Sequence, residues 1–253
     1  MGKLHACVER GREMNFRRFC FAALLFATII AVGPASATCS NTILNGVWGY
    51  QVGAAVGHFT ADGQGNITNG SQTVSENGVI KTQTFTGTYA VSKKCTGGVT
   101  INFTAGGSST ARFVADDSNK GLQIIDTISG LVAGGFGLAQ GAVTCGLTGK
   151  KATFAANLFG KIVNTGPIAY VAQVILDGKG TVSGSGTFDV NGTIVTAPIK
   201  GSYTENSDCT GTVKMTLSQS ITLNFNFVVV NGGKEILLIE TDASTIVAGS
   251  MQQ

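Results

Sequence analysis

The sequence predicts an all-β protein built from two tandem antiparallel up-and-down β-barrels of about eight strands each. Three observations lead to this fold class. The second half of the chain repeats the first, apolar and polar residues alternate over short runs, and Gly, Asn-Gly or Asp-Gly turns separate these runs. Two β-sandwich domains would satisfy the same pattern and are the alternative.

The repeat is clearest in the turns and at the strand ends. Asp-Gly-x-Gly at 62–65 returns at 177–180, Asn-Gly at 77–78 returns at 191–192, and Cys-Thr-Gly at 95–97 returns at 209–211. Between positions 77 and 95 the copies keep a constant offset of 114 residues without a gap. Agreement over such a length indicates a duplication, and because turn formers and strand residues are what repeat, the repeated feature is architecture.

Residues 1–37 are predicted to be a cleavable signal peptide. From Met14 the chain has two arginines, an apolar run, a Gly-Pro break and Ala-Ser-Ala, which is typical of a leader cleaved after Ala37. Residues 1–13 lack this pattern, so Met14 is the expected start. The apolar run is short for a membrane helix of about 20 residues. We therefore expect a secreted or periplasmic protein with no membrane span after cleavage.

Removal of the leader changes the charge balance of the chain. The full sequence has 17 Lys and Arg against 14 Asp and Glu, and the leader removes five and two of these, which leaves 12 of each. The mature chain is therefore neutral and keeps a single arginine, Arg112. Without a basic cluster, nucleic acid is not an expected partner.

Four cysteines remain in the mature chain, two in each copy, and an even number in an exported protein indicates disulfides. Of the three possible pairings, the duplication favours Cys39 with Cys95 and Cys145 with Cys209, since each copy would then be closed independently. Their spacing does not suit a zinc ribbon, and His58 is the only histidine left to assist. No metal and no cofactor are predicted.

The copies are expected to span 38–141 and 142–253. Strand-like runs are clearest in the second copy, near 151–158, 167–176, 180–190, 193–206, 211–219, 221–230, 234–241 and 245–251. Short connections between them imply that sequential strands pair. Eight such strands can close into a barrel, which removes the exposed sheet edges.

One strand differs between the copies in a way that concerns the interior. The second copy has large residues on one face and the first has small ones, namely Ile221, Leu223, Phe225, Phe227 and Val229 against Gly107, Ser109, Ala111, Phe113 and Ala115. Normal packing leads us to expect that Trp48 and Tyr50 fill the space. If they do not, the first barrel holds a cavity suited to a small apolar ligand.

Few residues are candidates for chemistry. His58 has Gln173 as its counterpart, so we expect a surface histidine at a strand end rather than a catalytic base. Asp126 and Glu240 occupy equivalent places on apolar strands, where an outward or rim position is expected. If they point inward, they become acid/base or ligand-orienting groups with a raised pKa.

The two aspartates of the repeated turns, Asp62 and Asp177, stand alone between glycines and are expected to cap hairpin turns rather than to bind calcium. No catalytic residue is predicted. The candidate ligand-binding residues are Trp48, Tyr50, His58, Ser109, Asp126 and Glu240.

Taken together, several motifs resemble a group of exported bacterial repeat proteins of unassigned function. They are Leu-Asn-Gly at 44–46, Asp-Gly-x-Gly-Asn at 62–66, Gly-Thr-Tyr at 87–89, Cys-Thr-Gly at 95–97 and Thr-Asp at 241–242. The resemblance implies a barrel similar in shape to allene oxide cyclase and lipocalins. It departs in the second copy, where Leu-Thr-Gly at 147–149 replaces Leu-Asn-Gly. Turn motifs of this kind imply a fold rather than a function.

Three functional hypotheses follow from this sequence. The first is a non-enzymatic exported barrel protein that binds a small apolar ligand or a cell-envelope partner. The second is a barrel enzyme of the cyclase or isomerase kind acting on a hydrophobic substrate. The third is a structural or adhesive module of the cell surface. Converging polar groups inside one barrel would favour the enzyme, and a cavity alone would favour the carrier.

Overall fold

The computed structural model describes residues 38–116, 118, 120–141, 145–218 and 221–253, and residues from Thr38 to Gln253 belong to one compact unit. The predicted signal peptide and its cleavage site lie outside these residues.

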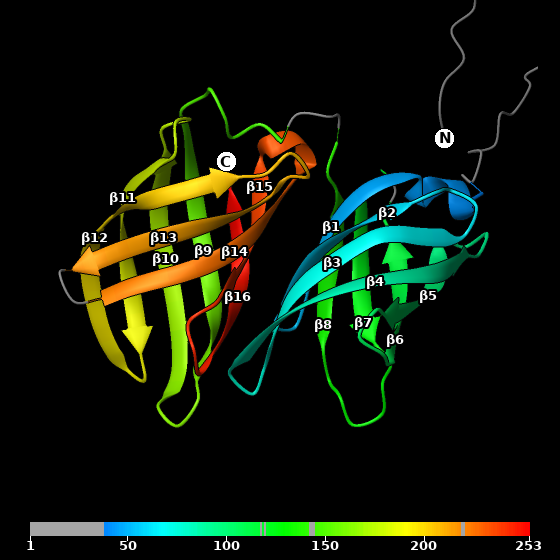
Figure 1. The fold of residues 1–253 in the computed structure, drawn as a ribbon, viewed down its shortest axis with the longest axis horizontal. Helices are drawn as coiled ribbons and strands as arrows, with labels where there is room; N and C mark the ends of the chain where they lie inside the picture. The colour runs from blue at the N-terminus through cyan, green and yellow to red at the C-terminus, as the bar shows by residue number, and fades with distance from the viewer. Residues whose placement is uncertain (1–37, 117, 119, 142–144, 219–220) are drawn as a thin grey trace, which may run out of the picture. The chain divides into compact units, whose positions relative to one another are not determined.

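Two closed antiparallel barrels of eight strands each make up the described chain, as Figure 1 shows. In each barrel every strand pairs with the next one in sequence, and the last strand pairs with the first. The predicted all-β fold and the up-and-down barrels are confirmed, and the β-sandwich alternative is wrong. Closure of both sheets leaves no unpaired edge strand in either barrel.

The first barrel begins after a short 3₁₀ helix, η1 (Asn41–Leu44). Its strands are β1 (Gly46–Val52), β2 (Ala55–Ala61), β3 (Asn66–Glu76), β4 (Val79–Val91), β5 (Thr96–Phe103), β6 (Ser108–Ala115), β7 (Gly121–Asp126) and β8 (Gly134–Ala139).

The second barrel contains a 3₁₀ turn, η2 (Asn231–Gly233), between two of its strands. The strands are β9 (Ala152–Ile162), β10 (Gly166–Leu176), β11 (Thr181–Val190), β12 (Thr193–Glu205), β13 (Thr210–Ser218), β14 (Ile221–Val230), β15 (Glu235–Glu240) and β16 (Thr245–Gln252).

One end of the first barrel is closed by the segment that precedes β1. Leu44 is 2% exposed, and its carbonyl oxygen accepts a hydrogen bond of 2.9 Å from the Trp48 indole. The Tyr89 hydroxyl donates to the Asn41 carbonyl at 3.1 Å, and the Asn41 side chain accepts from the Val91 amide at 2.8 Å. Because these bonds satisfy buried polar groups, the segment forms a stable plug.

The second barrel is closed in a similar way. Leu147 is 1% exposed, and its carbonyl oxygen accepts a hydrogen bond of 3.3 Å from the hydroxyl of Tyr203. The Glu205 carboxylate accepts from the Thr148 amide at 3.1 Å and from its hydroxyl at 2.7 Å. The repeated tyrosines 89 and 203 therefore serve the same purpose, which is to hold the entering chain over the barrel end.

The repeated Cys-Thr-Gly motifs combine a disulfide with a close packing contact. Cys39 pairs with Cys95 and Cys145 pairs with Cys209, each with a Cα–Cα distance of 5.0 Å, so the predicted pairing is confirmed. A Cβ atom on Gly97 would lie 2.2 Å from the ring of Phe113, and one on Gly211 would lie 2.3 Å from the ring of Phe227. Only glycine leaves room there for the phenylalanine.

The repeated Asp-Gly-x-Gly motifs are hairpin turns, as predicted. The Asp62 carboxylate accepts hydrogen bonds of 2.7 to 2.9 Å from the amides of residues 64, 65 and 66, and Asp177 accepts from those of residues 179 and 181. Gly63 and Gly178 adopt positive φ angles of 74° and 78°. Bonds from the Asn66 side chain and from backbone amides lower the pKa of Asp62 to about 2.

Strand β15 is buried on both of its faces, because it also packs against the other barrel. Glu240 and the alternating Ile236 and Leu238 face the interior of the second barrel. Leu237 and Ile239 face outward and join an apolar cluster that includes Val228 and Val230 of β14 and Val56 of β2. The second apolar surface explains why residues 236–239 show no alternation in sequence.

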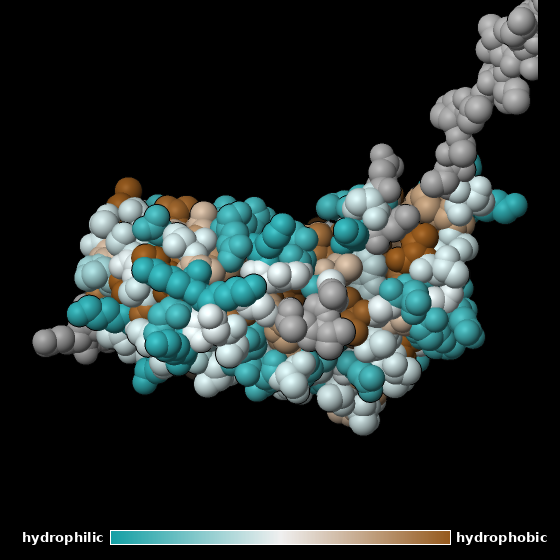
Figure 2. Space-filling view, turned by 90° about the horizontal axis from the view of Figure 1, so that it is seen from above, coloured by the Kyte–Doolittle hydropathy of each residue, from teal (hydrophilic) through white to brown (hydrophobic). Residues whose placement is uncertain are grey.

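Apolar side chains are also exposed elsewhere on the molecule. On the face in Figure 2, hydrophobic residues form separate patches among hydrophilic ones. Isolated exposed apolar residues are normal on a soluble protein surface. An exposed apolar patch therefore indicates a binding site only where it lies in a groove or beside a polar group that could bind a ligand.

Candidate functional site

The first barrel is more open to solvent than the second at the end opposite its plug. Six inward-facing residues of β5–β7 differ in burial from the residues 114 positions later in the second barrel. The pairs are Val99 and Val213, Ile101 and Met215, Phe103 and Leu217, Ala111 and Phe225, Ile124 and Leu238, and Asp126 and Glu240. In each of these six pairs the residue of the first barrel is half-buried and its counterpart is buried. Phe113 and Phe227, nearer the plugged ends, are both buried, and Ser109 and Leu223, at the rims, are both half-buried. Water therefore reaches interior positions in the first barrel that are sealed in the second.

A loss of side-chain bulk accounts for this difference. Ala111 stands where the second barrel has Phe225, Ser109 where it has Leu223, and the inward-facing Gly137 where it has Met251. Trp48 and Tyr50 do lie inside, at 2% and 8% exposure, as the sequence led us to expect. Trp48 belongs to the plugged end, however, so it cannot fill the space at the open end.

Aromatic rings line the interior between the plug and the open end. The ring of Tyr50 lies 6.0 Å from that of Phe59 and 6.4 Å from that of Phe85, and Phe85 lies 6.2 Å from Phe103, all measured between centroids. The last of these, Phe103, is half-buried and reaches the open end. Edge-on and tilted contacts of this kind are the favoured geometries for aromatic pairs.

Three polar side chains, linked by hydrogen bonds, lie among these aromatic rings. The Tyr50 hydroxyl donates to Gln72 Oε1 at 2.6 Å, and Gln72 Nε2 donates to Gln83 Oε1 at 2.8 Å. Burial raises the pKa of Tyr50 well above its usual value, so the phenol is neutral. The series of hydrogen bonds ends at Gln83, which is half-buried and thus able to offer its amide to a ligand.

Gln72 and Gln83 were not among the residues predicted from the sequence. Gln83 alternates with the buried Phe85 and Tyr89 along β4, and this phase alone would have placed it inside the barrel. Gln72 gave no such signal, because an irregularity in the pairing of β3 between Ile67 and Gly70 changes the phase of that strand.

Ser109 and Asp126 lie at the rim of the open end. The Ser109 hydroxyl approaches Asp126 Oδ2 at 3.4 Å, and Asp126 Oδ1 accepts a hydrogen bond of 2.8 Å from the Ile128 amide. Asp126 is half-buried, in keeping with the expected rim position. A carboxylate there can orient a polar group of a bound molecule without the cost of full burial.

His58 does not join these residues. It faces outward from β2, next to a groove of about 220 Å³, and its Nε2 lies 3.8 Å from Oδ2 of Asp208. The expected surface position at a strand end is wrong: His58 is in the middle of β2 and only 9% exposed. Burial lowers the pKa of His58, and the nearby Asp208 charge opposes part of that shift. His58 and Asp126 therefore cannot act together.

Glu240 also lies away from the open end, and its expected outward or rim position is wrong. It points into the sealed second barrel at 2% exposure, where Tyr170 donates a hydrogen bond of 3.0 Å to its Oε2. Burial raises the pKa of Glu240 to about 7, with a smaller contribution from the charge of Asp242. The pair is a buried polar contact within the core of the second barrel.

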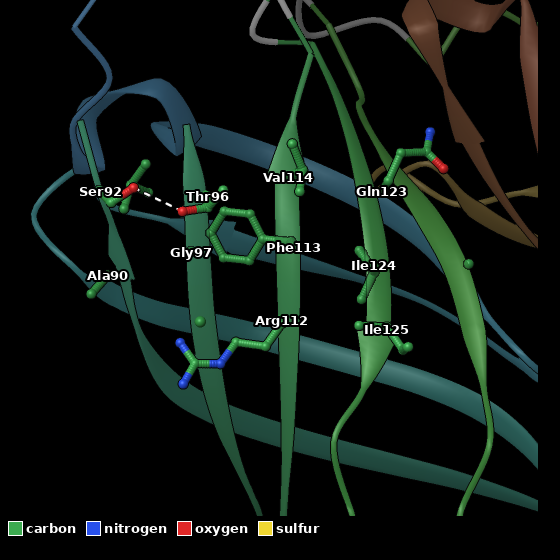
Figure 3. A pocket seen from close by; sticks show the side chains of 13 residues that line it. Ala90, Ser92, Thr96, Gly97, Arg112, Phe113, Val114, Gln123, Ile124 and Ile125 are labelled. Carbon is green, nitrogen blue, oxygen red and sulfur yellow. Dashed lines mark hydrogen bonds between the residues drawn. The ribbon is translucent and has the colours of Figure 1, made fainter. Parts of the chain in front are cut away.

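A separate groove of about 900 Å³ lies on the outer face of β5–β7 in the first barrel, shown in Figure 3. Arg112 and Val114 extend from β6, and Gln123 and Ile125 from β7. All four are exposed and alternate with the buried Phe113 and Leu122, which fixes them on the outside. These four side chains place the groove on the outer face, and Phe113 and Ile124 of the same strands also line it.

Metal-binding clusters and membrane-spanning helices are both absent from the described residues. Among the residues that the structure describes, no three His, Cys, Asp or Glu side chains gather closely enough to hold a metal ion. In the same part of the chain, no helix has the length and apolar character needed to span a membrane.

Comparison with known proteins finds no matching family model, no matching curated protein and no matching solved structure. The resemblance to exported bacterial repeat proteins and to allene oxide cyclase or lipocalin barrels therefore stays a prediction.

Proposed function

We propose that this chain is an exported, non-enzymatic binding protein whose first barrel holds a small, mainly apolar ligand at its open end. The observation that carries the proposal is the difference in burial between inward-facing residues of the first barrel and their counterparts in the second. Positions such as Ala111 and Ile124 are half-buried, while Phe225 and Leu238 are sealed. A barrel of eight strands is wide enough to hold one small ligand when its interior is not filled by side chains.

The chemistry of the wall indicates the class of ligand. Phe85 and Phe103 offer aromatic surface, and Gln83 and Asp126 offer one amide and one carboxylate. Sites of this composition take apolar molecules that carry a few hydrogen-bonding groups. Two disulfides are in keeping with an oxidising compartment. Catalysis has less support, because His58 and Asp126 lie on opposite sides of the barrel wall.

The proposal is tested by filling the interior. Ala111→Phe restores the ring that the second barrel has at Phe225, and Thr110→Phe places the same ring on the outward face of the same strand as a control. Nile red, an uncharged apolar dye, serves as the probe in fluorescence titrations of residues 38–253. We expect the affinity to fall by about tenfold or more in Ala111→Phe and to stay unchanged in Thr110→Phe. Equal dye affinity in Ala111→Phe and the unmodified protein would refute an interior site.

A further inference from the structure

Arg112 is the central charged residue of the outer groove of the first barrel. Arg112 is the only arginine of the mature chain. Within the described residues its guanidinium has no hydrogen bond or ion pair, whereas the two ion pairs found there involve His58 and Lys81. An exposed guanidinium held in a groove without a partner is ready to receive an anion.

The backbone beneath Arg112 favours this arrangement. Its side chain extends from β6 across β5, as Figure 3 shows. A Cβ atom on Gly98, the β5 residue paired with Arg112, would lie 3.2 Å from Arg112 Nη1. Glycine at this position lets the guanidinium lie close to the strand, within the groove instead of above it.

The second barrel shows that the fold does not need this charge. The residue 114 positions after Arg112 is Asn226, whose side-chain amide donates a hydrogen bond of 2.9 Å to Thr73. The neighbours of Asn226, Val228 and Ile239, are 3% and 0% exposed, whereas their counterparts Val114 and Ile125 are 51% and 58% exposed. The same face is thus covered by protein in one barrel and bare, with a cation at its centre, in the other.

The other residues that line the groove are partly aliphatic and partly polar. Val114, two residues further along β6, and Ile125, the β7 partner of Arg112, provide exposed aliphatic surface. Ser92 and Thr96 share a hydrogen bond of 2.8 Å at one end of the groove, and Gln123 adds an amide. The volume of about 900 Å³ lies within the range of small-molecule sites.

We propose that this groove binds an amphipathic carboxylate, with its carboxylate on the Arg112 guanidinium and its aliphatic part against Val114 and Ile125. A guanidinium matches a carboxylate in bidentate geometry. Sites for phosphate groups usually combine several cations, and no other cationic side chain lines this groove within the described residues. The proposal does not depend on ligand binding inside the barrel.

Decanoate is the probe, with uncharged decanol as its comparison, in calorimetric titrations of residues 38–253. Arg112→Gln removes the charge with little change in size, and Lys214→Gln removes one charge from an exposed position of β13 as the matched control. We expect Arg112→Gln to weaken decanoate binding by about tenfold or more, Lys214→Gln to leave it unchanged, and decanol to bind more weakly than decanoate. Added salt should weaken only the Arg112-dependent binding.

Two results would overturn the proposal. In the first, Arg112→Gln and the unmodified protein bind decanoate equally. In the second, Ala111→Phe abolishes decanoate binding and Arg112→Gln does not, which would assign decanoate to the barrel interior. Conversely, loss of Nile red binding in Ala111→Phe with intact decanoate binding would support both sites separately, so failure of one can be distinguished from failure of the other.

Discussion

The two barrels are alike at one end and different at the other. At the plugged ends, tyrosines 89 and 203 hold the entering chain, and the disulfides close onto Cys95 and Cys209. At the opposite ends, the second barrel is filled and the first is open. The repeated motifs therefore lie at the shared end, and the divergent end is where the proposed ligand site of the first barrel lies.

Buried polar groups reinforce this contrast. The hydrogen-bonded side chains of Tyr50, Gln72 and Gln83 have only small residues as counterparts in the second barrel. Strand register matches them to Ala156, Gly186 and Ala197. Conversely, the Tyr170–Glu240 pair matches Ala55 and Asp126 in the first barrel. Each barrel thus carries a polar contact that the other lacks, at a different place in its interior.

The largest expected effect on stability comes from the matched positions 111 and 225, where the two barrels differ in side-chain size. Phe225→Ala removes a ring that is 3% exposed in the second barrel, and we expect it to lower the free energy of unfolding by about 3–5 kcal/mol, since a cavity is left behind. The reciprocal change, Ala111→Phe, should be tolerated or stabilising because Ala111 is half-buried and a ring occupies the matched position of the second barrel. Urea unfolding followed by far-UV circular dichroism measures both.

A single tryptophan allows the unfolding of the first barrel to be followed separately. Trp48 is the only tryptophan of the chain and lies within the first barrel, so its fluorescence reports that barrel. Ala111→Phe should leave the Trp48 transition in place or move it to higher urea. A large destabilisation there would mean that the first interior is already filled, and the contrast between the two barrels would fail.

Protonation of Glu240 gives the next largest effect. Its pKa in the folded protein is raised from 4.5 to about 7, so the folded state binds this proton more tightly than the unfolded state. The stabilisation is fully present below about pH 4.5 and is lost as the pH rises through about 7, with a magnitude on the order of 3 kcal/mol. Glu240→Gln should abolish this pH dependence and stabilise the protein at pH 8.

Urea unfolding between pH 5 and pH 8 would follow the Glu240 effect. Asp126→Asn is the matched control, because it neutralises the equivalent carboxylate at the open rim of the first barrel, where water reaches it. If both substitutions changed the pH profile equally, burial in a sealed core would not be the cause of the Glu240 shift.

Sequence alone predicted the architecture because the relevant signals are local. Turn residues such as Asp62 and Asp177, the alternation along β14, and the even number of cysteines each act over a few residues or follow directly from the duplication. These signals led to the closed barrels and to both disulfides.

The candidate site was harder to predict from sequence. Its residues lie on strands that are irregular or buried on both faces, and on such strands the sequence does not show which side chains point inward. The irregularity near Ile67 in β3 concealed Gln72, and the two apolar faces of β15 concealed the inward position of Glu240. The groove around Arg112 had no sequence signal at all, since it arises from exposed residues on adjacent strands. His58 likewise gave no signal of its burial on the outward face of β2, because its neighbours there include Asp208, which is 150 residues away in sequence.

His58 gives the smallest expected effect, and its sign is opposite to that of Glu240. Burial lowers its pKa below 6.5, and the charge of Asp208 offsets part of this shift, so the folded state disfavours the imidazolium. Stability contributed by neutral His58 is present above about pH 6.5 and is lost as the pH falls toward the lower pKa of the folded protein. His58→Gln, which introduces the residue found at the matched position 173, should remove this loss on acidification.

Asp208→Asn should make the loss of stability on acidification larger, because the attraction that favours the charged imidazole is gone. The urea midpoint of Trp48 fluorescence at about pH 7.5 and about pH 5.5 measures both variants. An Asp208→Asn profile that is flatter than the unmodified one would show that Asp208 does not stabilise the protonated histidine, and that the two barrels are not coupled through this pair.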